Sequence, residues 1–196
     1  MSATPELLVK GKDDADFGLA LEAPTGGVKL NLGSGNRRIE GFVGIDSMVG
    51  GKGTDIVHDL DITPWPIKSN SVSKAVMIHS LEHFKDPIKI MNELYRVIMP
   101  EGLVYVEGPY WTSVGCWQDP THTHAISNEF FCYFNREWRL RQNMPQYPAT
   151  CDFNMEKVAL TFSEDFKGKT NEELEFALKH YLNVVENFVV ILRATK

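Results

Sequence analysis

Two glycines and an aspartate have the residue types and the spacing needed to bind a nucleoside. Gly33 and Gly35 directly follow an apolar segment, and Asp46 ends the next one. Glycines let the backbone approach a ligand closely, and a carboxylate at the end of the following strand can bind both hydroxyls of a ribose. Although a glycine pair alone also occurs in ordinary tight turns, segment 30–46 predicts a site for an adenosine-containing cofactor.

The residues after the glycines argue against a dinucleotide. A dinucleotide-binding loop has a third glycine, three residues after the second, at the start of a helix that receives the pyrophosphate. Arg38 occupies that position, and only the seven residues 36–42 separate Gly35 from the next expected strand, too few for a usual crossover helix. A ligand without phosphates does not need this helix. S-adenosylmethionine, which consists of adenosine, a sulfonium centre and an amino-acid tail, is such a ligand.

Asp59 is a second candidate for binding this cofactor. It follows a short expected strand at 55–57 and precedes the turn-rich segment 62–66. Because aspartates are common in turns, Asp59 could also belong to a solvated turn. Its place directly after a buried strand favours a binding role.

His79, Glu82 and His83 match a pattern found in one class of zinc proteases, in which two histidines bind zinc and the glutamate is the general base. That pattern requires a helix through all three residues. Residues 75–78 have the composition of a buried strand, and Pro87 follows four residues after His83, so at most about one turn of helix fits between them. We therefore expect structural roles for Glu82 and His83, which would tie the strand end to neighbouring loops. A zinc hydrolase is kept as an alternative.

Segment 119–124 supplies the candidate catalytic base. It follows the fifth expected strand, and loops at that end of an α/β sheet overhang the usual ligand site. A histidine with a pKa near 6.5 can accept the proton of a hydroxyl or amine as that group attacks a methyl carbon. We predict that His122 or His124 has this role, with His79 and Tyr110 as weaker candidates. The alternative is that these histidines only form hydrogen bonds with loop backbone.

The sequence predicts no resident metal ion. Cys116, His122, His124 and Cys132 are all potential zinc ligands, but their spacing matches no familiar zinc site. Cys132 also lies within the aromatic segment 130–134. We expect the cysteines to pack in the core.

The apolar pattern predicts strands alternating with helices. The expected strands are 28–32, 42–45, 55–57, 74–78, 103–107, 155–162 and 187–193, and the expected helices are 86–99, 128–141 and 171–181. Asp86 and Pro87 suit a helix start, and Thr170 with Glu173 forms a capping box. Because a strand, helix, strand order favours a parallel sheet with right-handed crossovers, the expected fold class is α/β.

Length and composition fit one globular domain. The chain has 196 residues, of which 43% are hydrophobic, and a formal net charge of −6. We expect residues 1–27 to form an N-terminal arm, irregular or with a short helix, and residues 28–196 to form the domain. The acidic balance argues against a nucleic-acid partner. An odd number of cysteines, no secretory signal and no long apolar run predict a cytoplasmic protein without a membrane partner.

Five segments, in this order, resemble the class I S-adenosylmethionine-dependent methyltransferases. They are 30–35, 44–46, 58–60 with 64–66, 79–83 and 99–103. The likeness covers about residues 28–108 and is greatest to a methyltransferase type 11-like branch of predicted methyltransferases with a shortened first crossover. The resemblance implies a Rossmann-like α/β fold with a mostly parallel seven-stranded sheet and an antiparallel C-terminal strand.

The resemblance also implies roles for individual residues. Gly33 and Gly35 would line the methionine part of the cofactor, Asp46 would bind the ribose hydroxyls, and Asp59 with Leu60 would lie at the adenine. The complete expected cofactor-binding set is Leu32, Gly33, Ser34, Gly35, Asp46, Ser47, Asp59, Leu60 and His79. The sequence departs from the family at Asn31, where an acidic residue is usual, and at Glu101 with Gly102, where a glycine pair is usual.

Taken with the resemblance, these residues predict a methyltransferase that converts S-adenosylmethionine to S-adenosylhomocysteine. The acceptor is not identified, and a small molecule or a saccharide is favoured over nucleic acid. A protein that binds S-adenosylmethionine without transferring its methyl group, as the silent partner of another enzyme, is the alternative from a different class.

Overall fold

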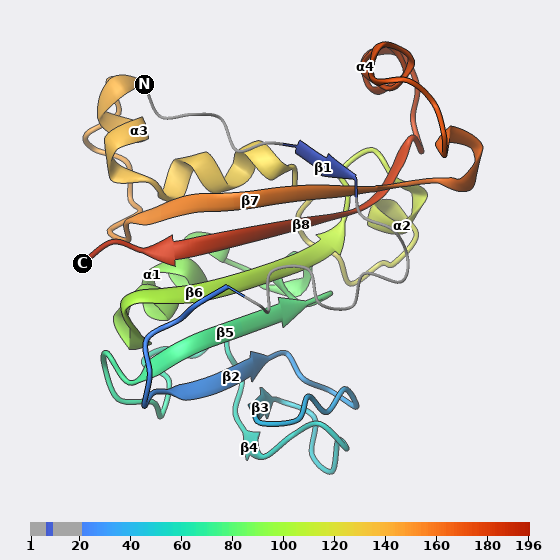
Figure 1. Cartoon of the computed structure of the whole chain (residues 1–196). Helices are drawn as coiled ribbons and strands as arrows, with labels where there is room; N and C mark the ends of the chain where they lie inside the picture. Colours follow the sequence, from blue (N-terminus) through green and yellow to red (C-terminus); the bar gives the residue numbers. More distant parts are fainter. Residues whose placement is uncertain (1–6, 10–20) are drawn as a thin grey trace.

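One eight-stranded sheet forms the centre of the protein in the computed structural model, which describes residues 7–9 and 21–196 (Figure 1). The strands are β1 (Leu7–Val9), β2 (Val28–Leu32), β3 (Val43–Asp46), β4 (Ile56–Val57), β5 (Val72–Ile78), β6 (Ile98–Pro109), β7 (Phe153–Phe162) and β8 (Val185–Ala194). Their order across the sheet is β1-β7-β8-β6-β5-β2-β3-β4.

Strands β2 to β8 form the seven-stranded sheet that the sequence predicts. Neighbouring strands are parallel except for β8, which is antiparallel to both β6 and β7. The α/β class, the mostly parallel sheet and the antiparallel C-terminal strand are therefore confirmed.

Strand β1 adds an eighth strand at the edge of the sheet. It pairs in parallel with β7, from Leu7 opposite Val158 to Val9 opposite Leu160. The expected arm at 1–27 thus contains a strand, where we expected irregular chain or a short helix. Residues 1–6 and 10–20 of that arm lie outside the described residues.

The connection between β2 and β3 is short and consists of turns without a helix. Asn31, the residue that departs from the family pattern, is buried, and its side-chain Nδ2 donates to the carbonyl oxygen of Arg37 at 2.8 Å. Asn31 therefore stabilises the shortened loop. As the sequence predicts, no helix N-terminus follows β2.

The helices are α1 (Pro87–Val97), α2 (Val114–Trp117), α3 (Arg136–Arg141) and α4 (Asn171–His180), with 3-10 turns η1 (Leu81–His83), η2 (Asn128–Phe134) and η3 (Glu164–Phe166). At the start of α1 the Asp86 side chain accepts a hydrogen bond from the Lys89 backbone N–H. The helix ends at Val97, two residues before the expected end, because Ile98 is extended and begins β6.

The single helix expected over 128–141 is instead divided into η2 and α3. Asn135, between them, is extended, and its side-chain oxygen accepts from the backbone N–H of Trp138 at 2.7 Å. Its Nδ2 donates to the carbonyl of Phe153 at 3.2 Å. Asparagine is favourable at a helix cap and unfavourable inside a helix, so these bonds account for the break.

The buried core lies on both faces of the sheet. The larger cluster includes the apolar side of α1, which lies behind the sheet in Figure 1, and the two phenylalanines Phe131 and Phe134 of η2. Cys116 and Cys151 are buried and unpaired, as expected for core cysteines, whereas Cys132 is only partly buried. Burial raises the pKa of the Cys151 thiol to about 12. No helix within the described residues is long and apolar enough to cross a membrane.

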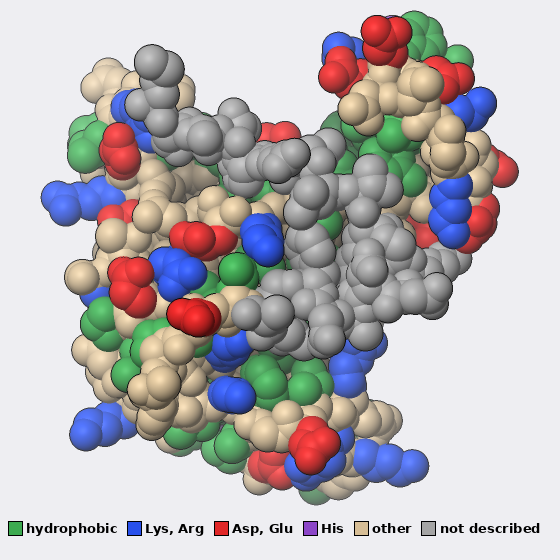
Figure 2. Space-filling model, in the orientation of Figure 1, with side chains coloured by type: hydrophobic (Ala, Val, Ile, Leu, Met, Phe, Trp, Pro, Cys, Tyr) green, Lys and Arg blue, Asp and Glu red, His purple; other side chains and the backbone are tan. Residues whose placement is uncertain are grey.

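Charges of both signs are interspersed on the face of the molecule that Figure 2 shows. Lysine and arginine side chains lie among aspartate and glutamate side chains over the described part of this face, without one continuous basic surface.

Candidate active site

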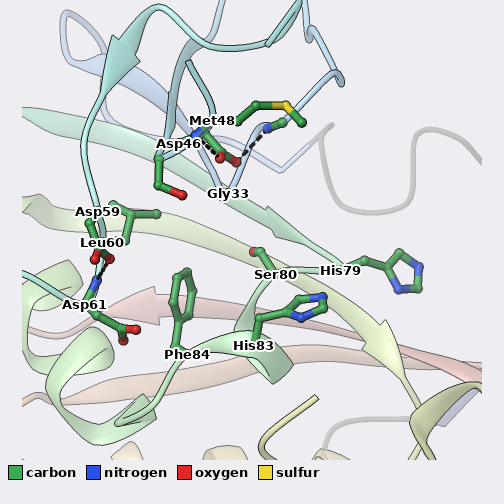
Figure 3. A pocket seen from close by; sticks show the side chains of 12 residues that line it. Gly33, Asp46, Met48, Asp59, Leu60, Asp61, His79, Ser80, His83 and Phe84 are labelled. Carbon is green, nitrogen blue, oxygen red and sulfur yellow. Dashed lines mark hydrogen bonds between the residues drawn. The ribbon is translucent and has the colours of Figure 1, made fainter. Parts of the chain in front are cut away.

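A cavity of about 420 Å³ lies at the carboxyl ends of β2, β3, β4 and β5 (Figure 3). Its volume is in the usual range for small-molecule sites, roughly 300 to 1,000 Å³. The lining residues are Gly33, Gly35, Asp46, Ser47, Met48, Asp59, Leu60, Asp61, His79, Ser80, His83 and Phe84. Strands β2 and β5 are neighbours, and the chain continues from β2 toward one edge of the sheet and from β5 toward the other. Ligands of α/β proteins bind at this kind of switch point.

The cavity brings together most of the residues predicted to bind the cofactor, with two exceptions. Leu32 is completely buried, and Ser34 is 2% exposed, so neither lines the cavity. Both lie in the β2 strand end and turn that support Gly33 and Gly35. Their place in the glycine motif predicted contact with the ligand, but both side chains are buried in the protein.

Two features require a glycine at position 33: its backbone conformation and a close neighbouring side chain. Its φ is +70°, a region that residues with a Cβ rarely adopt. A Cβ on Gly33 would lie 2.4 Å from the Cβ of Ser80, at the end of β5. The Gly33 N–H donates to the carbonyl of Ile45 at 2.9 Å, which fixes the turn against β3.

Asp46 is held rigidly at the end of β3. Its Oδ2 accepts from the Gly35 N–H at 2.7 Å, and its Oδ1 accepts from the Met48 N–H at 2.8 Å (Figure 3). Each carboxylate oxygen can accept more than one hydrogen bond. The carboxylate can therefore order the glycine turn and still accept bonds from two hydroxyls of a ligand.

Asp59 and Leu60 form another wall of the cavity, at the left of Figure 3. Asp59 Oδ1 accepts from the Asp61 N–H at 3.0 Å, so the turn considered from the sequence does form. Leu60 is buried, and its carbonyl accepts from the indole N–H of Trp65 at 2.9 Å. The turn is thus also a part of the cavity wall.

Glu93 of α1 fixes this wall through a hydrogen bond to the segment that follows it. It accepts from the Trp65 backbone N–H at 2.6 Å and from Arg96 Nη2 at 2.5 Å. Burial alone would raise the pKa of Glu93, but the bonds from Arg96 and Trp65 outweigh burial and lower it below the usual value. Glu93 is therefore ionised in the folded protein at neutral pH.

We expect Glu93→Gln to lower the free energy of unfolding by about 2 kcal/mol at neutral pH, because hydrogen bonds to charged groups contribute roughly 1.5 to 3 kcal/mol. Since the folded pKa is lowered, this contribution is complete above the unfolded pKa near 4.3 and is lost as the pH falls through the folded value. Urea unfolding of both proteins between neutral pH and pH 3 measures it. A gap between the two proteins that stays constant down to pH 3 would contradict the assignment.

His79, Ser80 and His83 form the part of the wall that follows β5. His79 has a positive φ of 52°, and its backbone N–H donates to the carbonyl of Glu107 at 2.9 Å. Only the three residues of η1 are helical here, and His79 precedes them. The helix that the zinc-protease pattern requires does not form, as the sequence predicts.

The loop 119–124 docks on η1 and does not enter the cavity. The backbone N–H groups of Thr123 and His124 donate to the carbonyl of Glu82 at 2.8 and 3.4 Å. His124 Nε2 lies 3.3 Å from the carbonyl oxygen of Lys85. His122 is nearly buried, with Nδ1 2.9 Å from the carbonyl oxygen of Cys116 and Nε2 4.0 Å from Glu82 Oε1. Neither predicted base lines the cavity.

Five lining residues were not predicted from the sequence: Met48, Asp61, Ser80, His83 and Phe84. Met48, Asp61 and Ser80 each neighbour a predicted site residue in the sequence. Ser80 contacts Gly33 across the boundary between β5 and β2, a pairing that depends on the strand order. For His83, the histidine pattern had been noticed, but a structural role was expected.

Comparison with known proteins supports the resemblance to methyltransferases. Residues 47–106 match the family model described as a methyltransferase domain, a segment that includes β4, β5, α1 and most of β6. No curated protein matches the sequence. A S-adenosylmethionine-dependent methyltransferase from Archaeoglobus fulgidus is similar in structure, with a TM-score of 0.58, 17% identity and 86% of each chain covered. The chain has the class I methyltransferase fold.

Two further solved structures share this methyltransferase fold. A chain of a complex that contains the Trm112 methyltransferase activator of Haloferax volcanii has a TM-score of 0.58 and 16% identity, covering 91% of this chain and 87% of that one. A Bacillus halodurans protein named as a methyltransferase has a TM-score of 0.57 and 13% identity, covering 95% of this chain and 100% of that one. At these identities the neighbours establish the fold, and the resemblance of the sequence to class I methyltransferases is confirmed.

Proposed function

We propose that the protein binds S-adenosylmethionine in the cavity at the ends of β2 to β5 and transfers its methyl group to a small molecule or a saccharide. The observation that carries the proposal is the convergence of Asp46 and Asp59 with the Gly33–Gly35 turn on one cavity. A nucleoside without phosphates fits this arrangement, because it needs a ribose-binding carboxylate and close backbone but no helix N-terminus.

The residues present suit the parts of this cofactor. Asp46 offers a fixed carboxylate for the ribose hydroxyls, and Leu60 with Phe84 offers apolar surface for the adenine. Gly33 lines the cavity, and the methionine tail would bind along its backbone. Family resemblance assigns the same roles to Gly33, Asp46 and Leu60.

When bound, the cofactor supplies an activated methyl group on a sulfonium, which is already a good leaving group. The protein therefore mainly has to orient the acceptor in line with the methyl carbon and exclude water. A base is needed only for an acceptor that must lose a proton. His124 is turned to the Lys85 carbonyl, so of the two predicted histidines we retain only His122, whose Nε2 has no hydrogen-bond partner within the described residues.

Titration with S-adenosylhomocysteine tests the proposal. Asp46→Asn should weaken binding by at least about tenfold, because charge-assisted hydrogen bonds contribute roughly 1.5 to 3 kcal/mol. Asp55→Asn is the matched control. Asp55 also accepts from a backbone N–H, that of Gly44 at 2.8 Å, but it does not line the cavity, so its replacement should leave the affinity nearly unchanged.

Equal affinities for wild type and Asp46→Asn would contradict the ribose assignment. The wild type could instead bind S-adenosylhomocysteine but form none of it from S-adenosylmethionine in the presence of hydroxyl or amine acceptors. That result would favour the silent-partner alternative. The binding and transfer measurements thus separate the two functions.

A further inference from the structure

Glu82 is a buried carboxylate whose oxygens have no hydrogen-bond partner among the described residues. Its side chain is 1% exposed, and neither Oε1 nor Oε2 accepts a hydrogen bond. The nearest basic atoms to Oε1 are Nδ1 of His79 at 3.5 Å and Nε2 of His122 at 4.0 Å. Buried carboxylates in folded proteins are usually hydrogen-bonded, paired or bound to a metal ion, so this one requires an explanation.

Glu82, His83 and His122 together present three potential metal ligands. One oxygen of Glu82 and one nitrogen of each histidine lie within 4.8 Å of one another. Within the part of the chain that the structure describes, no other group of three or more such side chains is this close. The ring centroids of His83 and His122 are 4.7 Å apart, with the rings nearly perpendicular.

Neighbouring groups orient both histidines through one ring nitrogen. The carbonyl of Cys116 can only accept, so Nδ1 of His122 donates to it, and Nε2 is the nitrogen that remains for a cation. The hydroxyl of Thr121 donates to Asp119 Oδ1 at 2.6 Å and therefore accepts from Nδ1 of His83 at 3.0 Å. Nε2 is then the nitrogen of His83 that remains for a cation. Metal-binding histidines are commonly oriented in this way, through the nitrogen that does not bind the metal.

We propose that Glu82, His83 and His122 bind a divalent cation, zinc by preference, at the wall of the cofactor cavity. Two histidines and one glutamate are a ligand set of catalytic zinc, which keeps a fourth position open for water or substrate. Donor atoms around a tetrahedral zinc lie about 3.3 Å apart, whereas the three ligand atoms here lie within 4.8 Å of one another. The distances between them would therefore shorten by at most about 1.5 Å on zinc binding. Glu82 would then gain the partner that it lacks.

The location of the cluster gives the cation a function. His83 lines the cavity, so the cation would lie beside the cofactor that the proposed function places there. It would bind an oxygen of the acceptor and lower the pKa of a hydroxyl, which loses its proton to solvent. The oxygen–carbon bond to the methyl group forms as the carbon–sulfur bond breaks. This inference rests on the proposed function, and it makes His122 a metal ligand and the acceptor an oxygen compound that can bind a cation.

Zinc titration of metal-stripped, full-length protein by calorimetry tests the site directly. We expect one zinc ion per chain. Glu82→Gln and His122→Ala should each weaken zinc binding by at least about a hundredfold, because loss of a residue that only hydrogen-bonds to a metal ligand already costs about 10- to 100-fold in affinity. His124→Ala is the matched control, because His124 lies in the same loop but outside the cluster. Its zinc affinity should equal that of the wild type. Circular dichroism establishes that each variant is folded.

No zinc binding by the folded wild type, or equal binding by wild type and Glu82→Gln, would overturn the proposal. Glu82 would then be paired with a protonated His79 or His122. The same samples are titrated with S-adenosylhomocysteine. Cofactor binding without zinc binding refutes the metal site alone, and zinc binding without cofactor binding refutes the proposed function alone.

Discussion

Gly33→Ala is expected to lower the free energy of unfolding by about 2 to 5 kcal/mol and to remove most affinity for S-adenosylhomocysteine. The left-handed conformation of Gly33 disfavours a residue with a Cβ by roughly 1 to 2 kcal/mol. The new Cβ would also lie 2.4 Å from the Cβ of Ser80, and overpacking typically costs about 1 to 3 kcal/mol. Relief of this contact moves the glycine turn away from β5, and with it the wall of the cavity.

Gly41→Ala separates the two causes. Gly41 belongs to the same loop and has a φ of +76°, but a Cβ there would meet no atom within 4 Å. Its replacement should therefore cost only the conformational part, about 1 to 2 kcal/mol, and should preserve the cavity. Chemical denaturation and cofactor titration of both variants measure the difference. Equal effects of the two substitutions would mean that the contact between Gly33 and Ser80 is unimportant.

Glu82→Gln should stabilise the metal-free protein and remove most of the stabilisation that zinc gives to the wild type. In metal-free protein the substitution removes a buried charge that lacks hydrogen-bond partners, so we expect the free energy of unfolding to rise by about 1 to 3 kcal/mol. Zinc at 100 times its dissociation constant should stabilise the wild type by about 2.7 kcal/mol and the variant far less. Thermal unfolding with a chelator and with added zinc measures both values.

The opposite sign in metal-free protein would identify a different partner for Glu82. If the buried carboxylate is paired with a protonated His79 or His122, glutamine breaks that pair and the variant is the less stable protein at every zinc concentration. The chelator experiment alone therefore decides between an unpaired and a paired carboxylate.

The sequence predicted the sheet well because its strands carry strong local signals. The short apolar runs that end at Leu32, Asp46 and Ile78 are punctuated by glycine or polar residues, and the spacing between Gly35 and β3 was enough to exclude a helix. The break at Asn135 was missed because the aromatic pattern continues through it. Its cause is a hydrogen bond to β7, a contact that only the folded chain brings about.

The cofactor cavity and the metal cluster differ in how far they can be predicted. The residues Gly33, Gly35 and Asp46 lie close together in the sequence, and a strand–turn–strand unit suffices to bring them together. The metal cluster combines two separate motifs: Glu82 and His83 belong to segment 79–83, and His122 belongs to segment 119–124. Neither motif alone predicted a metal site. Only the docking of loop 119–124 on η1 combines them.

A crystal structure of the protein in complex with S-adenosylhomocysteine tests the central claim most directly. We predict that both ribose hydroxyls lie within hydrogen-bond distance of Asp46, that the adenine contacts Leu60, and that the sulfur faces the side of the cavity lined by His79 and His83. A nucleoside bound elsewhere on the protein, or a ribose without contact to Asp46, would contradict the account.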